Sequence, residues 1–110
     1  MKRELIYSSE YMDFYRKSNR RTQEKLLYAT SILETVTPVP SKFVKKRVGT
    51  DFYEMRVSVD TEIRMIWFSI DNDNINEAKS VVFLNGFIKK STKDYEKAIV
   101  EGLKILRRLL

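Results

Sequence analysis

The sequence contains no cysteine and no histidine. Without cysteine, the chain forms neither disulfide bonds nor thiolate metal sites. Without histidine, it lacks the imidazole group that most often binds metals and carries protons near neutral pH. We therefore expect no zinc or other metal site, no cofactor and no catalytic triad.

Long apolar runs are also missing. No segment approaches the roughly 18 consecutive apolar residues that a membrane-spanning helix needs. The N-terminal stretch MKRELIYSSEY is interrupted by polar residues and lacks the apolar core of a signal peptide. These absences predict a cytoplasmic protein with no membrane partner. The 110 residues are most simply one domain, residues 1–110, large enough to bury roughly two-thirds of the surface of the unfolded chain.

Positive charge is in excess and unevenly distributed. Twenty-one Lys and Arg residues against fifteen Asp and Glu give a formal charge of +6, which suits nucleic acid, an acidic protein partner or solubility alone. Residues 35–50 and 78–93 contain no carboxylate. The candidate RNA-binding residues in these windows are Lys42, Lys45, Lys46, Arg47 and Lys93. We interpret the windows as one binding face; the alternatives are solvated charge and, for residues 42–47, protection of a sheet edge.

The spacing of apolar residues predicts a short strand followed by two helices. The strand is expected over residues 3–8, and the helices over residues 10–17 and 22–34. The expected N-cap residues are Ser8 or Ser9 for the first helix and Thr22 for the second. The two helices are expected to form a hairpin.

The second half of the chain predicts a sheet and a last helix. The expected strands span residues 42–48, 52–59, 63–70 and 80–88, and an amphipathic helix begins at residue 94 or 95 and ends at residue 110. This order predicts an α+β fold, in which an N-terminal strand and a helix hairpin pack on a three- to four-stranded antiparallel sheet with a C-terminal helix. We expect the helices on one face of the sheet, which leaves the other face free for function.

Two arginines lie within the long predicted strands over residues 52–59 and 63–70. Arg64 stands in an otherwise apolar strand, where an isolated charge is expensive to bury. It either pairs with Glu54 or Glu62, or opens onto a concave surface where its planar guanidinium binds a phosphate. Arg56 alternates away from the apolar face of the preceding strand and is expected near Arg64 across the hairpin.

Three candidate site residues follow the last predicted strand. Lys89 and Lys90 are adjacent in extended chain, so only one of them needs to face the arginines, and we favour Lys90. A lysine flanked by cations has its ammonium form disfavoured, which makes it a better proton carrier; the alternative is surface solubility. Tyr95 lies near the start of the last helix, where it either hydrogen-bonds a phosphate or belongs to the apolar stripe of the helix.

Three short motifs stand in a fixed order along the second half of the chain. They are FYEMR at residues 52–56, IRMIWF at residues 63–68 and FLNGFIKKSTK at residues 83–93. In order and separation they resemble the Tyr-Glu-apolar-Arg strand, the arginine strand and the Gly-Phe, double-lysine signature of the RelE/HigB group of bacterial type II toxins, especially its phage-derived branch. The sequence departs from this pattern in Asn85, in the lack of histidine, and in Asp94 and Tyr95, where the branch commonly has a proline.

The resemblance implies a RelE-like fold and a toxin that cleaves mRNA, in many relatives only at the ribosome. It also implies a cognate antitoxin, expected to be a helix-turn-helix protein, so the expected partners are this antitoxin, mRNA and the ribosome. Carried over by position, the implied catalytic residues are Arg56, Arg64, Lys89, Lys90 and Tyr95.

RNA cleavage without metal or imidazole is expected to use the 2′-hydroxyl of the substrate, giving a 2′,3′-cyclic phosphate and a 5′-hydroxyl. Arg56 and Arg64 would stabilise the developing charge. Lys90 or Lys89 would aid deprotonation, and Tyr95 or a lysine would protonate the leaving oxygen. The alternatives are a ParE-like gyrase inhibitor that acts by protein contact, which the double-lysine motif disfavours, and a noncatalytic nucleic-acid-binding domain.

Overall fold

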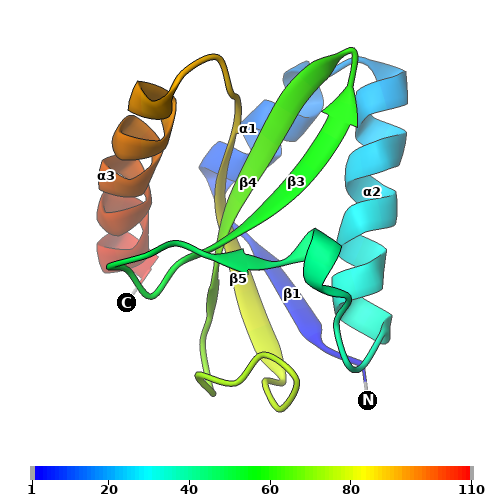
Figure 1. The fold of residues 1–110 in the computed structure, drawn as a ribbon, viewed down its shortest axis with the longest axis vertical. Helices are drawn as coiled ribbons and strands as arrows, with labels where there is room; N and C mark the ends of the chain where they lie inside the picture. Colours follow the sequence, from blue (N-terminus) through cyan, green and yellow to red (C-terminus); the bar gives the residue numbers. More distant parts are fainter. Residues whose placement is uncertain (1, 110) are drawn as a thin grey trace.

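The first elements of the chain are a strand and a capped helix. The computed structural model describes residues 2–109, shown as a ribbon in Figure 1. Strand β1 (Glu4–Tyr7) leads into helix α1 (Ser9–Lys17). The Ser8 hydroxyl oxygen caps this helix by accepting a hydrogen bond from the Tyr11 backbone N–H at 3.0 Å. Ser8 is therefore the N-cap, and Ser9 is the first helical residue.

Helix α2 (Arg20–Thr35) completes the predicted helix hairpin. Its N-cap is Asn19, whose side-chain oxygen accepts a hydrogen bond from the Thr22 backbone N–H at 2.8 Å. The predicted cap at Thr22 is wrong because Asn19 offers an equally suitable acceptor one turn earlier. Thr22 is instead a buried residue of the first helical turn.

The predicted strand over residues 42–48 is much shorter than expected. Ser41–Phe43 forms a single 3₁₀ turn, η1, and only Lys45–Lys46 pairs with the sheet, as strand β2. The chain then turns back through Gly49, whose φ of +79° is a conformation that favours glycine. The short strand ends one edge of the sheet, where its exposed lysines discourage pairing with another strand.

The other predicted strands are confirmed to within about two residues at each end, and they are β3 (Tyr53–Val59), β4 (Thr61–Ser69) and β5 (Ser80–Ile88). The sheet has the order β1-β5-β4-β3-β2. It has five strands and is mixed, whereas an antiparallel sheet of three or four was predicted. The difference arises because β1 adds to the edge beside β5 and runs parallel to it; a four-residue strand carries no signal for the edge that it will join.

Helix α3 (Thr92–Leu109) begins two residues before the earliest predicted start. The Asp94 carboxylate explains the early start, because it accepts hydrogen bonds from the backbone N–H groups of Lys90 and Ser91 at 2.6 and 2.8 Å. These donors lie just ahead of the helix and would otherwise lack partners. The predicted end at Leu110 lies outside the described residues.

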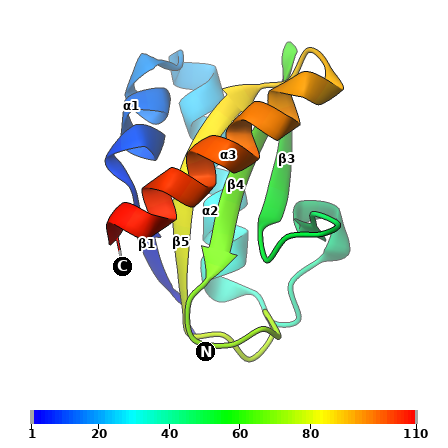
Figure 2. The ribbon, with the colours of Figure 1, turned by 90° about the vertical axis from the view of Figure 1, so that its left-hand side faces the viewer.

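The helices cover both faces of the sheet, so the prediction that they share one face is wrong. Figure 2 shows α3 crossing one face while α1 and α2 lie behind the other. On β4, Met65 and Trp67 pack in the core with α1 and α2, whereas Ile66 between them packs in the core with α3. A central strand that is apolar on both faces requires cover on both sides. Within residues 2–109, no helix is both long and apolar enough to cross a membrane.

Candidate functional site

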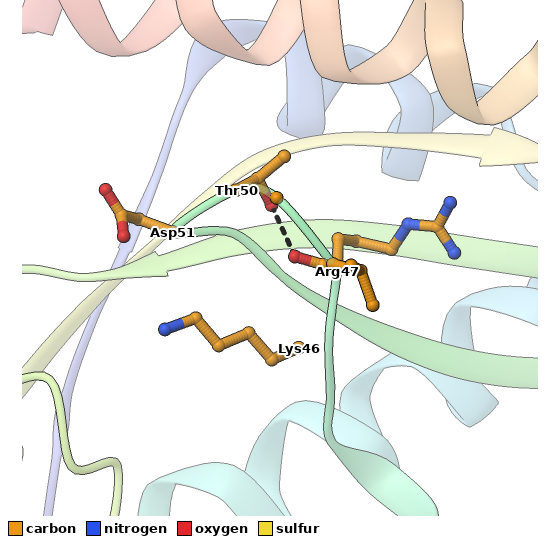
Figure 3. A pocket seen from close by; sticks show the side chains of 6 residues that line it. Lys46, Arg47, Thr50 and Asp51 are labelled. Atoms are coloured by element: carbon orange, nitrogen blue, oxygen red, sulfur yellow. Dashed lines mark hydrogen bonds between the residues drawn. The ribbon is translucent and has the colours of Figure 1, made fainter.

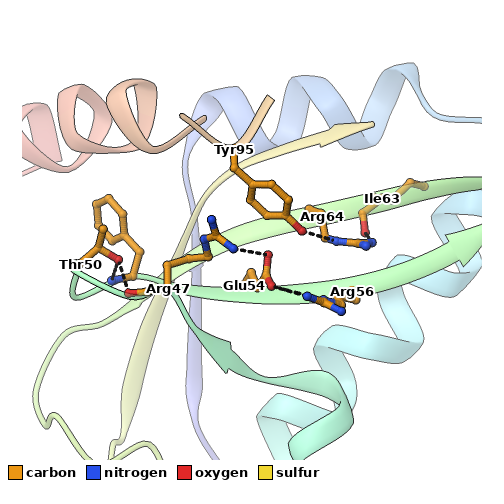
Figure 4. Close-up of polar contacts among 8 residues, drawn as sticks. Arg47, Thr50, Glu54, Arg56, Ile63, Arg64 and Tyr95 are labelled. Atoms are coloured by element: carbon orange, nitrogen blue, oxygen red, sulfur yellow. Dashed lines mark hydrogen bonds and ion pairs between the residues drawn. The ribbon is translucent and has the colours of Figure 1, made fainter. Parts of the chain in front are cut away.

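Two arginines face each other across β3 and β4. Arg56 and Arg64 are direct partners in the antiparallel register, which confirms the expectation that they lie close together across the hairpin. Both side chains lie on the face of the sheet that α3 covers, together with Tyr95 from its first turn (Figure 4). Like charges directly opposite each other are destabilising unless neighbouring groups compensate them.

Arg64 is almost completely buried and makes polar contacts in three directions. Its Nε donates a hydrogen bond to the Tyr95 hydroxyl oxygen at 2.7 Å, and its Nη1 donates to the Ile63 carbonyl at 3.0 Å. Nη1 also lies 3.6 Å from the Glu62 carboxylate. Of the two predicted acidic partners, Glu62 is therefore the one that pairs with Arg64. The guanidinium is held in one orientation before any ligand arrives.

Tyr95 combines the two roles that the sequence left open. Its side chain is buried, with 5% of its surface exposed, and its ring meets the edge of Phe87 at a centroid distance of 5.5 Å. Two cations lie over the ring: the Arg47 guanidinium carbon at 4.1 Å and the Lys89 Nζ at 5.5 Å from its centroid. Tyr95 is thus both a core residue and the centre of a group of positive charges.

The phenol of Tyr95 is held in its protonated form. Burial raises the pKa of Tyr95 above its ordinary value, the hydrogen bond from Arg64 opposes this rise, and the nearby Glu54 carboxylate adds to it. Because Arg64 donates to the phenol oxygen, that oxygen acts as an acceptor in this contact, and its own proton remains available for another partner. The phenol therefore keeps its proton at neutral pH.

Glu54 is a member of the site for which the sequence suggests only pairing with Arg64. Its side chain is completely buried, and its Oε1 accepts hydrogen bonds from Nε and Nη2 of Arg56 at 3.2 and 3.0 Å. Its Oε2 lies 4.0 Å from Nη1 of Arg47. The hydrogen bond to Glu54 raises the pKa of Arg56. Glu54 lies two residues before Arg56 on the same strand face, a spacing that could have identified the pair.

The two neighbouring lysines have different surroundings. Lys89 is half-buried, with its ammonium over the Tyr95 ring and its backbone N–H bonded to the Glu62 carbonyl at 2.7 Å. Lys90 is exposed, and its backbone N–H donates a hydrogen bond to the Asp94 carboxylate. The alternation expected of adjacent residues is present, but the structure brings Lys89 to Tyr95. The catalytic role favoured for Lys90 stays a prediction.

Arg47 is the one predicted RNA-binding residue that contacts Tyr95. It belongs to the loop after β2, where a shallow pocket of about 410 Å³ is lined by Lys46, Arg47, Val48, Gly49, Thr50 and Asp51. Figure 3 shows the Arg47 and Lys46 side chains extending in different directions from this loop, with the Thr50 hydroxyl bonded to the Arg47 carbonyl at 3.0 Å. The remaining predicted RNA-binding residues, Lys42, Lys45, Lys46 and Lys93, are exposed.

Asn85, where the chain departs from the RelE/HigB pattern, ties β5 to α3. Its Nδ2 donates a hydrogen bond to the Ala98 carbonyl at 3.1 Å, and its Oδ1 is buried without a partner. The residue lies on the same face as Phe87 and supports the first turns of α3. Its hydrogen bond gives it a structural function between β5 and α3.

We refer to the residues around this phenol as the Tyr95 cluster, which consists of Arg47, Glu54, Arg56, Glu62, Arg64, Lys89 and Tyr95. Its four cations outnumber its two carboxylates, so the cluster favours an anion. Planar guanidinium groups suit a phosphate in particular. Within residues 2–109, no three His, Cys, Asp or Glu side chains gather as they would around a metal ion.

Comparison with solved structures identifies the same fold in bacterial toxins. The chain is similar to an arginine-to-alanine double mutant of E. coli toxin RelE in the free state, with a TM-score of 0.65 and 17% identity over 90% of this chain and 96% of that chain. It is also similar to isolated E. coli RelE (TM-score 0.57, 17% identity, 98% and 99% of the two chains). The toxin-antitoxin complex RelBE2 from Mycobacterium tuberculosis matches with a TM-score of 0.56 and 14% identity over 81% and 100%.

These likenesses confirm the RelE-like α+β fold. No curated protein matches the sequence significantly. The model of one protein family, described as phage-derived protein Gp49-like (DUF891), matches residues 13–107. Since this match covers most of the chain and includes every residue of the Tyr95 cluster, the protein belongs to the phage-derived Gp49-like family, as its resemblance to RelE/HigB toxins led us to expect.

Proposed function

We propose that this protein is the toxin of a type II toxin-antitoxin module and a metal-independent mRNA endoribonuclease that acts at the ribosome, in the cytoplasm. The observation that carries the proposal is the buried Arg64, fixed by Tyr95 and directly opposite Arg56. A buried arginine held in this way can stabilise a phosphate at which negative charge develops. The likeness to RelE toxins supports the biological setting.

The proposed reaction begins with attack of the 2′-oxygen of the RNA on its adjacent phosphorus. The bond to the 5′-oxygen of the next nucleotide then breaks, leaving a 2′,3′-cyclic phosphate and a 5′-hydroxyl. Arg64 and Arg56 stabilise the additional negative charge on the phosphate oxygens. Lys89, or Lys90 from the adjacent exposed position, acts in its neutral amine form and receives the 2′-hydroxyl proton, while Tyr95 gives its phenol proton to the leaving oxygen and is left as a phenolate.

The proposed partners are a cognate antitoxin, mRNA and the ribosome. Relatives with this fold have been crystallised with antitoxins, as in the E. coli RelBE complex and in RelBE2. We expect a helix-turn-helix antitoxin that presents acidic and apolar side chains, because the formal charge of this chain is +6. Such a partner would neutralise the basic surface on which RNA is proposed to bind.

The test is induced expression in a bacterium of the wild type, Arg64→Ala and the control Arg16→Ala, with new mRNA 5′ ends mapped against ribosome position. Arg16 is an exposed arginine on α1 that pairs with Asp13 at 3.5 Å, so its removal also breaks an ion pair. We expect cleavage within translated codons by the wild type and by Arg16→Ala. Arg64→Ala should lower the rate by about 100- to 1,000-fold.

Three results would contradict the proposal. Near-normal cleavage by a folded Arg64→Ala protein would reject the central role of Arg64. Growth arrest with intact mRNA would indicate a protein target, as in the ParE-like alternative. Salt-sensitive RNA binding without cleavage on ribosomes would indicate a noncatalytic binding domain. Thermal unfolding of each variant establishes that the comparison is made on folded protein.

A further inference from the structure

Glu54 is the only buried carboxylate among residues 2–109, and none of its surface is exposed. A group in this position cannot touch a substrate, so any effect on chemistry must act through its neighbours. A buried carboxylate is costly unless cations and hydrogen bonds compensate it. Both neighbours that compensate Glu54 are arginines, and both reach the surface.

Arg56 is bound to Glu54 through two of its N–H groups. Nε and Nη2 both donate to Oε1, at 3.2 and 3.0 Å. Of the five N–H donors of a guanidinium, three remain available. The Arg56 side chain is 46% exposed, so these remaining donors can reach a ligand in solvent.

Arg47 approaches the other oxygen of the same carboxylate. Its Nη1 lies 4.0 Å from Oε2 of Glu54, and its guanidinium carbon lies 4.1 Å from the centroid of the Tyr95 ring. Oε2 has no hydrogen-bond partner, so charge attraction and stacking on Tyr95, rather than a direct bond, hold Arg47 in place. The Arg47 side chain is 28% exposed.

We propose that Glu54 is a positioning residue that holds Arg47 and Arg56 on the two oxygens of one buried carboxylate. The two arginines would then bind a substrate phosphate together, beside Arg64. This inference rests on the proposed ribonuclease function. It assigns Arg47 to the phosphate-binding site rather than to the outlying basic surface. The orientation of Arg64 does not depend on Glu54, because Tyr95, the Ile63 carbonyl and Glu62 hold its guanidinium.

The physical basis is the repulsion between the two guanidinium groups. With the carboxylate present, each arginine gains an attraction that offsets this repulsion and restricts its rotamers. A glutamine amide keeps one oxygen acceptor but no negative charge, so the hydrogen bonds to Arg56 weaken, the repulsion is no longer offset and both side chains become more mobile. A misplacement of about 1 Å at a reacting centre costs roughly 100-fold in rate.

The first arm of the test measures side-chain order without RNA. Relaxation of the arginine Nε–Hε groups is recorded by NMR for the wild type, Glu54→Gln and the control Glu24→Gln, in which an exposed carboxylate that pairs with Arg20 is removed. We expect the Arg56 Nε–Hε to be ordered in the wild type and in Glu24→Gln and mobile in Glu54→Gln. The Arg64 Nε–Hε, bonded to Tyr95, should stay ordered in all three.

The second arm measures single-turnover cleavage of ribosome-bound mRNA per folded molecule. Glu54→Gln should lower the rate by about 10- to 100-fold, and Glu24→Gln should leave it unchanged. Added to an Arg47→Ala, Arg56→Ala background, Glu54→Gln should change the rate by less than about 2-fold, because the groups through which it acts are gone. Glu54→Asp keeps the charge and should recover part of the rate.

Two results would overturn the inference: an ordered Arg56 Nε–Hε in Glu54→Gln, or an undiminished effect of Glu54→Gln in the double-arginine background. If Glu54→Gln does not fold, Glu54→Asp replaces it, and its Arg56 order and its rate must fall together for the inference to stand. A wild type that cleaves no RNA would refute the proposed function alone, since the NMR arm still decides whether Glu54 positions Arg56.

Discussion

At the scale of single residues, Tyr95 connects the hydrophobic core to the charged surface. Its ring packs against Phe87 below α3, and its hydroxyl oxygen binds the guanidinium of Arg64. The ring and the hydroxyl can therefore be separated by substitution. Loss of the whole side chain would remove both the packing against Phe87 and the hydrogen bond to Arg64, whereas loss of the hydroxyl alone keeps the packing.

We predict that Tyr95→Phe lowers the rate of RNA cleavage by about 100-fold or more while the protein stays folded, because the substitution removes a proton donor and keeps the ring. Removal of the hydrogen bond to Arg64 should cost about 1 to 3 kcal/mol of unfolding free energy. Single-turnover kinetics and urea unfolding measure the two effects. Tyr53→Phe is the matched control, since it removes a hydroxyl bonded to the Asp73 carbonyl at 3.0 Å. Wild-type cleavage by Tyr95→Phe would exclude its role as proton donor.

The sequence identified most members of the Tyr95 cluster but not how they are connected. Arg64 was recognisable because a charge in an apolar strand needs an explanation, and period-two alternation placed Arg56 beside it. The contact between Arg47 and Tyr95 joins residues 48 positions apart, from 47 to 95. Neither periodicity nor motif spacing reports such a contact. For Glu54, the spacing to Arg56 on one strand face was a usable signal, whereas its approach to Arg47 was not.

At the scale of elements, the two buried interfaces of the sheet differ in how closely the backbones approach. A Cβ added at Gly86 on β5 would meet the Phe14 ring of α1 at 2.5 Å. At Gly102 on α3, the nearest atom, from Phe52, lies at 3.4 Å, an ordinary contact distance. The glycine on β5 therefore permits the close seating of α1, while the glycine on α3 is not required for packing.

We predict that Gly86→Ala destabilises the protein by about 1 to 3 kcal/mol, because Phe14 must move away from β5. Gly102→Ala should be neutral or stabilising by up to about 1 kcal/mol, since alanine is the better helix former. Urea unfolding of both variants checks the contrast. Equal effects at the two positions would show that the packing of Phe14 on β5 is not limiting.

An ion pair between the first and last helices makes stability depend on pH. Arg108 on α3 lies 2.6 Å from the Glu10 carboxylate on α1, and its hydrogen bond is the main cause that lowers the pKa of Glu10 to about 2 from 4.5. A carboxyl whose pKa is lower in the folded state stabilises the fold above its unfolded pKa. This contribution is lost as the pH falls through the folded value.

We therefore predict that Arg108→Ala lowers the unfolding temperature most above pH 4.5, and that the difference from the wild type shrinks as the pH approaches 2. Thermal unfolding across this pH range measures the effect. Arg107→Ala, an exposed neighbour in the same helical turn, is the control and should show little dependence on pH. A constant difference for Arg108→Ala would mean that Glu10 is not its relevant partner.

The elements themselves were largely predictable, and their ends were not. Long amphipathic or alternating patterns identified α2, α3 and the three long strands. The cap at Asn19 depends on one hydrogen bond, the early start of α3 on two, and the reduction of β2 to two residues on one turn. Several neighbouring residues could have served as caps, so the sequence alone did not distinguish them.

At the scale of the whole molecule, the positive surface extends beyond the Tyr95 cluster. Lys42, Lys45 and Lys46 are exposed beside the loop that carries Arg47. In the proposed function, the charges on this surface attract the polyanion at long range, whereas the Tyr95 cluster acts on one phosphate.

We predict that RNA affinity falls steeply with salt and that replacing Lys42, Lys45 and Lys46 with glutamine reduces the slope of log affinity against log salt. The reduction should be roughly 0.7 for each phosphate that is no longer neutralised, about 2 in all. Fluorescence anisotropy of a labelled single-stranded RNA at several KCl concentrations measures the slope. Lys104→Gln, an exposed substitution on α3, is the control. An unchanged slope in the triple variant would exclude this surface from RNA binding.

The sequence did not predict which helices cover which face of the sheet. The apolar character of both faces of β4 already indicated cover on two sides, yet the helices were expected on one face. The strands identified the buried positions without indicating which helix would cover them. The site therefore lies not on a bare sheet face but on the face that α3 covers, at the first turn of that helix.

The parallel pairing of β1 with β5 also determines when the molecule can be completed. Residues of β1 pair with residues that are synthesised 76 positions later, as Glu4 does with Ser80. Tyr95 is synthesised later still. Because synthesis proceeds from the N-terminus, a nascent chain carries Arg56 and Arg64 before the phenol that orients Arg64 exists. The site for the proposed activity therefore cannot assemble until the ribosome has translated residue 95, late in the synthesis of the chain.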